Sequence, residues 1–401
     1  MTDLAESLVE RGVEVTAVAG RGSYNGGATY PAGELYRGVR VERAWSSGFG
    51  KKSLWGRLAD YLSFYVGAFV KLWRLERHDI IMALTTPPLI GCVAIIVGRA
   101  RGMRVVALVQ DVYPDVAVKL GALPAGGLAT RVFERMNRFV LGRADRVVVL
   151  GDCMRERIVE KIGAERASRI DVIHNWADGQ KITPLAADEP NPFRVEHDLG
   201  DKFVVMFSGN FGRVNEFTTV LEAARVLRER AEIVFLFVGD GALASEIKDF
   251  VSAHQLCNIR LLPYQPRASL RHSLAAGDAL LVTLAEGLAG LSVPSKTYAI
   301  LAAGRPVLFV GDKRSDAARI VANHACGAVI EAGESEELAT TIREWSQNKT
   351  GLATCGVAAR RLFERSFDRA QAVDLYLATF AKCLHESSEH LMAGQQSRPS
   401  I

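Results

Sequence analysis

Lys296 stands directly after Pro294 and Ser295, where the sequence changes from a loop to a predicted helix. Proline suits the entry to a helix, and serine is a favourable N-cap residue. A lysine in the first turn is unfavourable, because the N-terminal end of the helix dipole is positive. An anion bound there would reverse that penalty. The placement therefore indicates either a phosphate-binding helix start or an ordinary helix with a solvated lysine.

Two glycine-bearing turns in the second half could also meet a phosphate group. In FSGNFGRVNEF, Gly209 and Gly212 follow a predicted strand, and Arg213 lies close to the next helix. The segment VGDG repeats the arrangement with Gly239 and Gly241. Glycines let the main chain approach a ligand, so free amides can face a diphosphate. Most such turns are only structural, and the aspartate between the last two glycines could simply cap a helix.

Two acidic residues in the first half follow a predicted strand. In LVQDVYPDVAVKLG, Asp111 comes at the strand end and Asp115 follows four residues later. The carboxyl ends of parallel strands are where ligands bind in such folds, so these acids could meet substrate hydroxyl groups. Turn chemistry is the alternative, because aspartate favours turns. In VIHNWADG, His174 and Asn175 border a domain boundary, and a packed turn explains them equally well.

Residues 50–78 form one predicted helical segment that interleaves aromatic and basic side chains. The charges within it argue against a membrane span, whereas the mixture suits a membrane interface. The alternative is a large core helix with a basic rim. The candidate membrane-facing residues are Lys51, Lys52, Trp55, Arg57, Lys71 and Trp73.

Short apolar runs alternate with amphipathic helical stretches along the whole chain, which predicts parallel sheets covered on both faces. Two such series predict two doubly wound, Rossmann-like α/β domains that face a cleft. We expect an N-terminal domain over residues 1–182, a proline-rich linker over 183–201 and a C-terminal domain over 202–362. Residues 363–385 are expected to form a helix that packs back on the first domain, and 386–401 a disordered tail.

The composition of the 401-residue chain excludes several classes of protein. A net charge of only +4 gives no support to nucleic-acid binding. The six cysteines are scattered, so neither a disulfide framework nor a structural zinc site is predicted. No signal peptide and no uncharged run long enough to span a bilayer are recognisable. We therefore expect a cytoplasmic protein, able to associate peripherally with the inner membrane.

The start of the chain departs from the usual order of a doubly wound domain. The chain opens with a predicted helix over 3–11 and a strand over 13–18, whereas a central strand and a glycine turn should come first. Without that strand, the strands at 13–18 and 104–109 should have unpaired edges, which are costly. This predicts that Met1 is not the beginning of the functional protein, or that the chain has lost activity.

The ordered set of motifs resembles the GT-B glycosyltransferases of family 4, in the WbuB-like branch of surface-polysaccharide assembly. The matching segments are QDVYPDVAVKLG, VIHNWAD, FSGNFGRVNEF, FVGDG, NIRLLPYQPRASL and GLSVPSKTYAILAAGRPVL. The resemblance implies a retaining enzyme that takes a hexose-type sugar from a nucleotide-diphospho-sugar, with no cofactor. It also implies a polyprenyl-linked acceptor at the inner membrane face, as in O-antigen or exopolysaccharide biosynthesis.

The resemblance also implies roles for particular residues. The second domain would hold the donor and the first domain the acceptor. We assign catalysis to Lys296, Arg213, Asp115 and Asp111. The candidate donor-binding residues are Gly209, Asn210, Gly212, Gly239, Asp240, Gly241, Ser292, Pro294, Ser295 and Tyr298. Nothing in the sequence demands a metal.

The chain departs from the family pattern at the donor side. Many members carry two glutamates with seven residues between them around this helix, and the corresponding positions here are Leu291 and Ala299. The contact to the nucleotide ribose is therefore not assigned. The usual arginine and lysine of the strand–helix loop fall on Asn210 and Asn215. Arg213 and Lys296 are then the cations left for the diphosphate.

Three alternatives are open at this point. A nucleotide-sugar 2-epimerase of the same fold would use acids near the donor sugar, and the missing glutamates count against it. A truncated, non-catalytic binding protein is favoured by the same loss and by the absent first strand. A dinucleotide oxidoreductase is a weaker alternative, because no complete G-x-G-x-x-G follows a strand. The sequence also lacks a carboxylate pair with the placement of a glycosidase.

Overall fold

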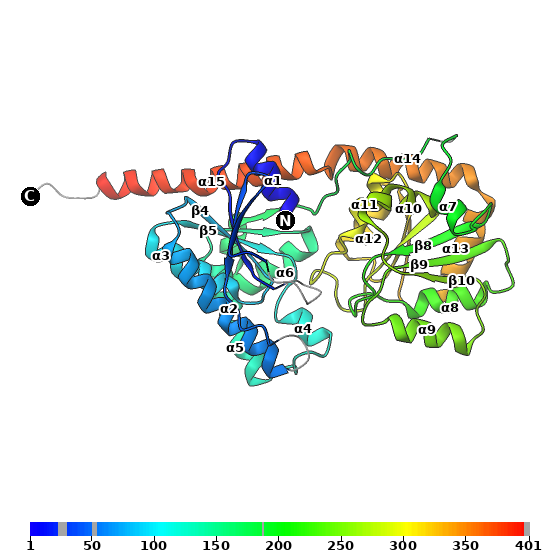
Figure 1. Ribbon diagram of the computed structural model, residues 1–401, viewed down its shortest axis with the longest axis horizontal. Helices are drawn as coiled ribbons and strands as arrows, with labels where there is room; N and C mark the ends of the chain where they lie inside the picture. Colours follow the sequence, from blue (N-terminus) through cyan, green and yellow to red (C-terminus); the bar gives the residue numbers. More distant parts are fainter. Residues whose placement is uncertain (23–29, 50–53, 187, 397–401) are drawn as a thin grey trace, which may run out of the picture.

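Three sheets organise the chain in the computed structural model, which describes residues 1–22, 30–49, 54–186 and 188–396. A three-stranded sheet of order β1-β3-β2 and a four-stranded parallel sheet of order β4-β5-β6-β7 belong to the first domain. A six-stranded parallel sheet of order β10-β9-β8-β11-β12-β13 forms the second domain. The two domains lie side by side, with helices around each sheet (Figure 1). Two α/β domains built on parallel sheets were predicted from the alternating pattern.

The first domain contains α1 (Thr2–Glu10), β1 (Thr16–Gly20), β2 (Gly33–Tyr36), β3 (Val39–Ala44), α2 (Leu54–Arg74), β4 (Ile80–Leu84), α3 (Ile90–Arg101), β5 (Arg104–Val109), α4 (Asp115–Lys119), α5 (Leu128–Arg143), β6 (Arg146–Val149), α6 (Asp152–Ile162) and β7 (Ile170–Val172). The second contains α7 (Pro192–Glu196), β8 (Phe203–Ser208), α8 (Thr218–Val226), β9 (Ile233–Val238), α9 (Ala244–Ala253), β10 (Ile259–Leu262), α10 (Leu270–Ala276), β11 (Ala279–Thr283), α11 (Lys296–Ala302), β12 (Val307–Val310), α12 (Asp316–Asn323), β13 (Gly327–Ile330) and α13 (Ser335–Gln347). The chain closes with α14 (Lys349–Ser366) and α15 (Arg369–Gln396).

The central strands follow from runs of apolar residues without a polar alternation. Every residue of β9, with the sequence IVFLFV, is buried, and so is every residue of β6 and β11. A strand covered by helices on both faces has no solvent side, so it needs no polar positions. These strands hold the loops at their carboxyl ends in place, and the candidate site is built from those loops.

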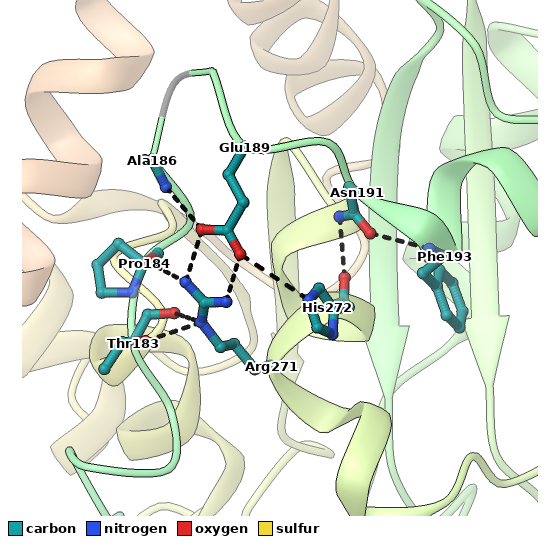
Figure 2. A network of polar contacts seen from close by, with 8 residues as sticks. All are labelled: Thr183, Pro184, Ala186, Glu189, Asn191, Phe193, Arg271 and His272. Carbon is teal, nitrogen blue, oxygen red and sulfur yellow. Dashed lines mark hydrogen bonds and ion pairs between the residues drawn. The ribbon is translucent and has the colours of Figure 1, made fainter.

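The expected linker over 183–201 is instead attached to the second domain. Asn191 caps α7 by accepting a hydrogen bond from Phe193 N, and its side-chain amide donates to the carbonyl of His272. Glu189 forms a two-pronged ion pair with Arg271 on α10, which also binds the Thr183 and Pro184 carbonyls (Figure 2). The first part of the expected linker is therefore fixed to α10 through Glu189, Asn191 and the carbonyls of Thr183 and Pro184.

The last helix returns to the first domain. Arg369 lies 3.5 Å from Asp178, and Arg11 of α1 forms a 2.7 Å ion pair with Asp374. Figure 1 shows α15 running along α1 and beyond it. The helix continues to Gln396, so residues 386–396, expected to be disordered, are helical, and 397–401 lie outside the described residues.

The expectation of unpaired edges at 13–18 and 104–109 is correct for one strand and wrong for the other. β1 pairs with β3 along one edge only. β5, however, lies between β4 and β6 and is paired on both sides, so the second open edge belongs to β4. The periodicity of a strand does not reveal its position in a sheet, which is why the wrong edge was chosen.

Candidate functional site

Lys296 begins α11 and is held above an aromatic ring. Its Nζ lies 3.7 Å from the centre of the Phe207 ring at the end of β8, and it donates a 2.9 Å hydrogen bond to Asn215 Oδ1. Burial lowers the pKa of the Lys296 ammonium to about 7. The aromatic face and the amide oxygen favour the charged form, but they only partly replace lost hydration. A carboxylate partner is absent from the described surroundings, so an incoming anion would find an unneutralised cation.

Asn215 connects this lysine to the β8–α8 loop. Its side-chain amide donates hydrogen bonds to the carbonyls of Asn210 at 3.1 Å and Gly212 at 2.9 Å. Its Oδ1 accepts from Thr283 Oγ1 on β11 as well as from Lys296. The side chain that replaces a cation of the family pattern therefore fixes the loop and directs the lysine. Apart from the departure from the family pattern, no sequence signal indicated this role.

The two glycine turns are packed against each other. Gly209 and Gly239 both have φ +142°, and Gly241 has φ +157°. A Cβ on Gly239 would overlap the Gly209 carbonyl oxygen, and one on Gly241 would overlap Asn210 Oδ1. Phe211 N donates to the Asp240 carbonyl at 2.9 Å. The close approach of the two turns therefore requires glycine at these positions. Both turns lie near Lys296, whose Cε is 3.6 Å from the position that a Cβ on Gly209 would take.

The other predicted donor residues differ in their surroundings. Arg213 is exposed in the β8–α8 loop, and no ion pair is found for it within the described residues. Asp240 accepts from its neighbouring Gly241 N at 2.8 Å, which is turn capping. Ser295 is the N-cap of α11 and makes no side-chain cap bond, and Pro294 accepts from Thr297 Oγ1.

Tyr298 does not line a donor pocket. Its side chain is fully buried, with the ring centre 5.1 Å from that of Phe367 and 6.5 Å from that of His174. It lies two residues after Lys296 and packs against Phe367, the residue that ends α14. We therefore correct its assignment: Tyr298 supports the core at the domain boundary.

Asp111 and Ser292 meet across the domain boundary. Ser292 Oγ donates a 2.7 Å hydrogen bond to Asp111 Oδ1, and the two residues form an antiparallel bridge. Val112 N also donates to the Leu291 carbonyl at 2.8 Å. Burial raises the pKa of Asp111, while the Ser292 hydrogen bond opposes that shift. The pair therefore joins the strand end of the first domain to the loop that leads into Lys296.

Asp115 lines a cavity of about 860 Å³ between α4, α5 and α6. Its carboxylate is paired with Lys161 at 2.6 Å and lies 3.5 Å from Arg157. Leu291 also lines this cavity, so the cavity adjoins the loop that carries Ser292. The structure thus separates the two predicted acids: Asp111 meets the second domain, and Asp115 faces the cavity of the first.

The cavity carries an excess of positive charge that the sequence analysis missed. Three acidic residues line it, namely Asp115, Glu134 and Glu160. Six basic residues line it, which are Lys119, Arg131, Arg135, Arg138, Arg157 and Lys161. The surplus is three positive charges, and within the described part of the chain Arg131 and Arg135 have no ion-pair partner. The three- and four-residue spacing of the arginines on α5 was the available signal.

The predicted membrane-facing residues are only partly placed. Lys51 and Lys52 lie outside the described residues, as do the side chains of Trp55 and Arg57. The assignment of Lys71 to the membrane-facing set is corrected, because its Nζ binds Glu42 Oε2 at 3.0 Å on the neighbouring strand β3. Trp73 is exposed and stacks on Phe69.

The exposed face of α2 is apolar rather than basic. Its exposed residues follow helical spacing and include Leu58, Leu62, Val66, Phe69 and Trp73. Among the helices that the structure describes, none is long and apolar enough to cross a bilayer. The described residues also contain no cluster of histidine, cysteine and carboxylate side chains that could hold a metal ion.

Comparison with known proteins decides the family. The profile of the glycosyl transferase 4-like domain matches residues 1–176, and that of the group 1 glycosyl transferases matches residues 189–362. WbjE of Pseudomonas aeruginosa, named as a glycosyltransferase, is 31% identical over 78% of this chain and 77% of its own length. The chain belongs to glycosyltransferase family 4. This membership decides for a glycosyltransferase over the epimerase and oxidoreductase alternatives.

Further relatives of this glycosyltransferase cover nearly the whole chain. WcaI of Escherichia coli (strain K12), which carries the name colanic acid biosynthesis glycosyl transferase, is 25% identical over 94% of this chain and 93% of its own. HepE from Anabaena, solved with UDP and glucose, has a TM-score of 0.68 at 19% identity, covering 86% of this chain and 87% of its own. WaaG, involved in lipopolysaccharide biosynthesis, has a TM-score of 0.65 at 15% identity, covering 94% and 93%. These structures show that the glycosyltransferase has the GT-B fold.

Proposed function

We propose that this family 4 enzyme is a retaining glycosyltransferase that moves a hexose-type sugar from a nucleotide-diphospho-sugar to a polyprenyl-linked acceptor in surface-polysaccharide biosynthesis. The observation that carries the donor assignment is the Lys296 ammonium, which has no carboxylate partner among the described residues and lies beside two glycine turns. HepE was solved with UDP-glucose, which supports a UDP-sugar as the first donor to test.

The reaction breaks the bond between the anomeric carbon and the donor diphosphate, so negative charge grows on the leaving oxygen. Lys296 and the amides beside Gly209 bind the diphosphate more strongly in the transition state than in the ground state, because the ground-state diphosphate carries less negative charge. Arg213 is exposed and can turn toward the same phosphates. The acceptor hydroxyl forms the new bond on the face that the diphosphate leaves, and its proton passes to the departing phosphate.

The cationic cavity of the first domain is the proposed acceptor site. A polyprenyl-linked saccharide carries phosphate groups, and a surplus of three positive charges suits them. The cavity adjoins Leu291, four positions before the loop residue Ser295, so acceptor and donor can meet at the domain boundary. Asp115 then shapes the acceptor site through Lys161, and Asp111 with Ser292 holds the domains together.

A transferase assay tests the function as a whole. Purified enzyme with UDP-hexoses and a polyprenyl-diphosphate-linked saccharide should release UDP and form a product that retains the anomeric configuration. Arg135→Ala should raise the KM for the acceptor by roughly tenfold, the loss of one charged contact, and leave UDP affinity unchanged. UDP release that is independent of acceptor, or an inverted product by NMR, would contradict the proposal.

Donor binding should take up a proton above neutral pH. Free Lys296 has a pKa of about 7, and the diphosphate favours the ammonium, so binding raises that pKa. UDP affinity should therefore fall as the pH rises above 7. Calorimetry at pH 8 in buffers of different ionisation enthalpy should show uptake of about one proton per UDP. Lys296→Met should remove this uptake, and an unchanged value in that variant would exclude Lys296 from the diphosphate site.

The apolar face of α2 is expected to hold the enzyme on the cytoplasmic face of the inner membrane. Exposed apolar side chains with helical spacing suit an interfacial helix. Val66→Asp should greatly reduce co-sedimentation with anionic vesicles, whereas Val195→Asp, at an exposed site on the second domain, should not. Binding should also fall with added salt, because basic residues flank the helix. If both variants co-sediment equally with the vesicles, the exposed face of α2 does not bind the membrane.

A further inference from the structure

The start of α6 in the first domain is capped by a side chain of the second domain. The N-cap residue of α6 is Gly151, which has no side chain to accept a hydrogen bond. Cys153 N donates instead to Asp316 Oδ1 at 3.0 Å, and Asp316 begins α12. Figure 1 shows α6 and α12 on the facing sides of the two domains. A carboxylate at a helix N-terminus satisfies a free amide and meets the positive end of the helix dipole.

The two surfaces fit closely around this cap. A Cβ on Gly151 would overlap the Asp316 carboxylate, so the glycine leaves the space that the carboxylate fills. Cys153 Sγ donates to the Arg314 carbonyl at 2.8 Å. The Cys153 carbonyl oxygen lies 2.9 Å from the position that a Cβ on Gly290 would take. The start of α6 therefore touches both the loop before α12 and the loop before α11.

The cap holds the domains only weakly, because the carboxylate is buried with one of its oxygens unpaired. Asp316 is 6% exposed, and its Oδ2 has no hydrogen-bond partner among the described residues. Burying a charged group with an unpaired oxygen costs free energy, and this cost offsets much of what the cap contributes. When the surfaces part, water can hydrate both the carboxylate and the helix amide. The free energies of the joined and the parted surfaces are therefore close.

We propose that Asp316 and the start of α6 form a latch that holds the two domains together and opens while each domain stays folded. Opening frees the carboxylate, the Cys153 amide and the Cys153 thiol at once, because all three meet at this contact. It also parts the loop before α11, which leads to Lys296, from the first domain. Such motions admit substrates and release products. This inference does not depend on the donor or acceptor of the enzyme, because the latch is built from other residues.

The Cys153 thiol reports the state of the latch. Burial raises the pKa of this thiol to about 12, so the closed latch keeps it protonated and unreactive. A thiol exposed at a helix N-terminus reacts faster, because the dipole favours the thiolate. Two other natural cysteines calibrate the measurement, since Cys257 is exposed and Cys326 is fully buried in the second domain. Alkylation of all three by iodoacetamide is followed in the full chain by peptide mass spectrometry.

Two variants open the latch from opposite sides. Asp316→Ala removes the cap and should raise the rate of Cys153 alkylation at least tenfold, the effect of losing a hydrogen bond to a charged group. Gly151→Ala should do the same from the first domain. Gly151 has an extended backbone with φ −179°, which alanine adopts without strain, and the nearest atoms to its added Cβ all belong to Asp316. Asp249→Ala, at an exposed position on α9, is the matched control and should leave Cys153 protected.

The calibrating cysteines and the molecular size decide between the outcomes. Cys257 should react equally in all four proteins, and Cys326 should stay protected. Small-angle X-ray scattering should show a larger radius of gyration in both latch variants than in Asp249→Ala. Unchanged Cys153 alkylation in both latch variants would overturn the proposal. So would a parallel rise at Cys326, which would mean unfolding, or fast Cys153 alkylation at an unchanged radius, which would mean local fraying of α6.

Discussion

Lys296→Met is expected to weaken UDP binding by about 1.5–3 kcal/mol, the range for a charged hydrogen bond in a partly buried site. The turnover rate should fall further, by roughly 10²–10³, because charge on the leaving diphosphate grows in the transition state. Calorimetry with UDP and a steady-state assay measure the two effects. Lys248→Met, which removes an exposed lysine from α9, is the matched control and should change neither. Equal affinity in both variants would contradict the diphosphate role.

The same substitution is expected to stabilise the free enzyme at low pH. The pKa of Lys296 is about 7 in the folded chain and 10.5 in its ordinary state, so the unfolded chain binds more protons between these values. Stability therefore rises with pH across that window in the natural enzyme, and the full cost of the buried charge applies below pH 7. At pH 6, Lys296→Met should raise the free energy of unfolding by up to about 5 kcal/mol, which is what a pKa lowered from 10.5 to about 7 represents. A loss of stability at pH 6 would show that the lysine holds the fold together.

Gly239→Ala should be among the most damaging single substitutions in the second domain. The residue has φ +142°, and an added Cβ would overlap the Gly209 carbonyl oxygen. Conformational strain and overlap with rigid main chain together should cost about 3–5 kcal/mol. The melting temperature should fall by about 6–20 °C, measured by scanning calorimetry. UDP affinity should fall as well, because the two turns would move apart.

Gly333→Ala is the control for Gly239→Ala. It also has a positive φ, of +94°, but nothing lies within 4 Å of its notional Cβ. Only the conformational cost of about 1 kcal/mol remains, and UDP affinity should be unaffected. Similar destabilisation by the two variants would show that the close approach of the glycine turns is not what fixes this site.

Local patterns in the sequence determined the elements and their order. Continuous apolar runs such as IVFLFV predict buried strands because a strand between two helical layers has no solvent face. The alternation of strands and helices then gives two α/β domains. Lys296 at a helix start and the glycines at 209 and 239 were also recognisable, since helix capping and positive φ are properties of a few neighbouring residues.

Only the tertiary structure decided which residues share a site. Lys296 meets Phe207 and Asn215, and Asp111 meets Ser292, through contacts between residues that are 81 to 181 positions apart. Strand order brings these segments together, and the period of a strand carries no information about its neighbours. The same reason explains why β4, and not β5, has the open edge, why Asp115 is paired with Lys161, and why Tyr298 is buried. Each of these outcomes depends on which elements pack together, a choice made by burial and hydrogen bonding over the whole chain.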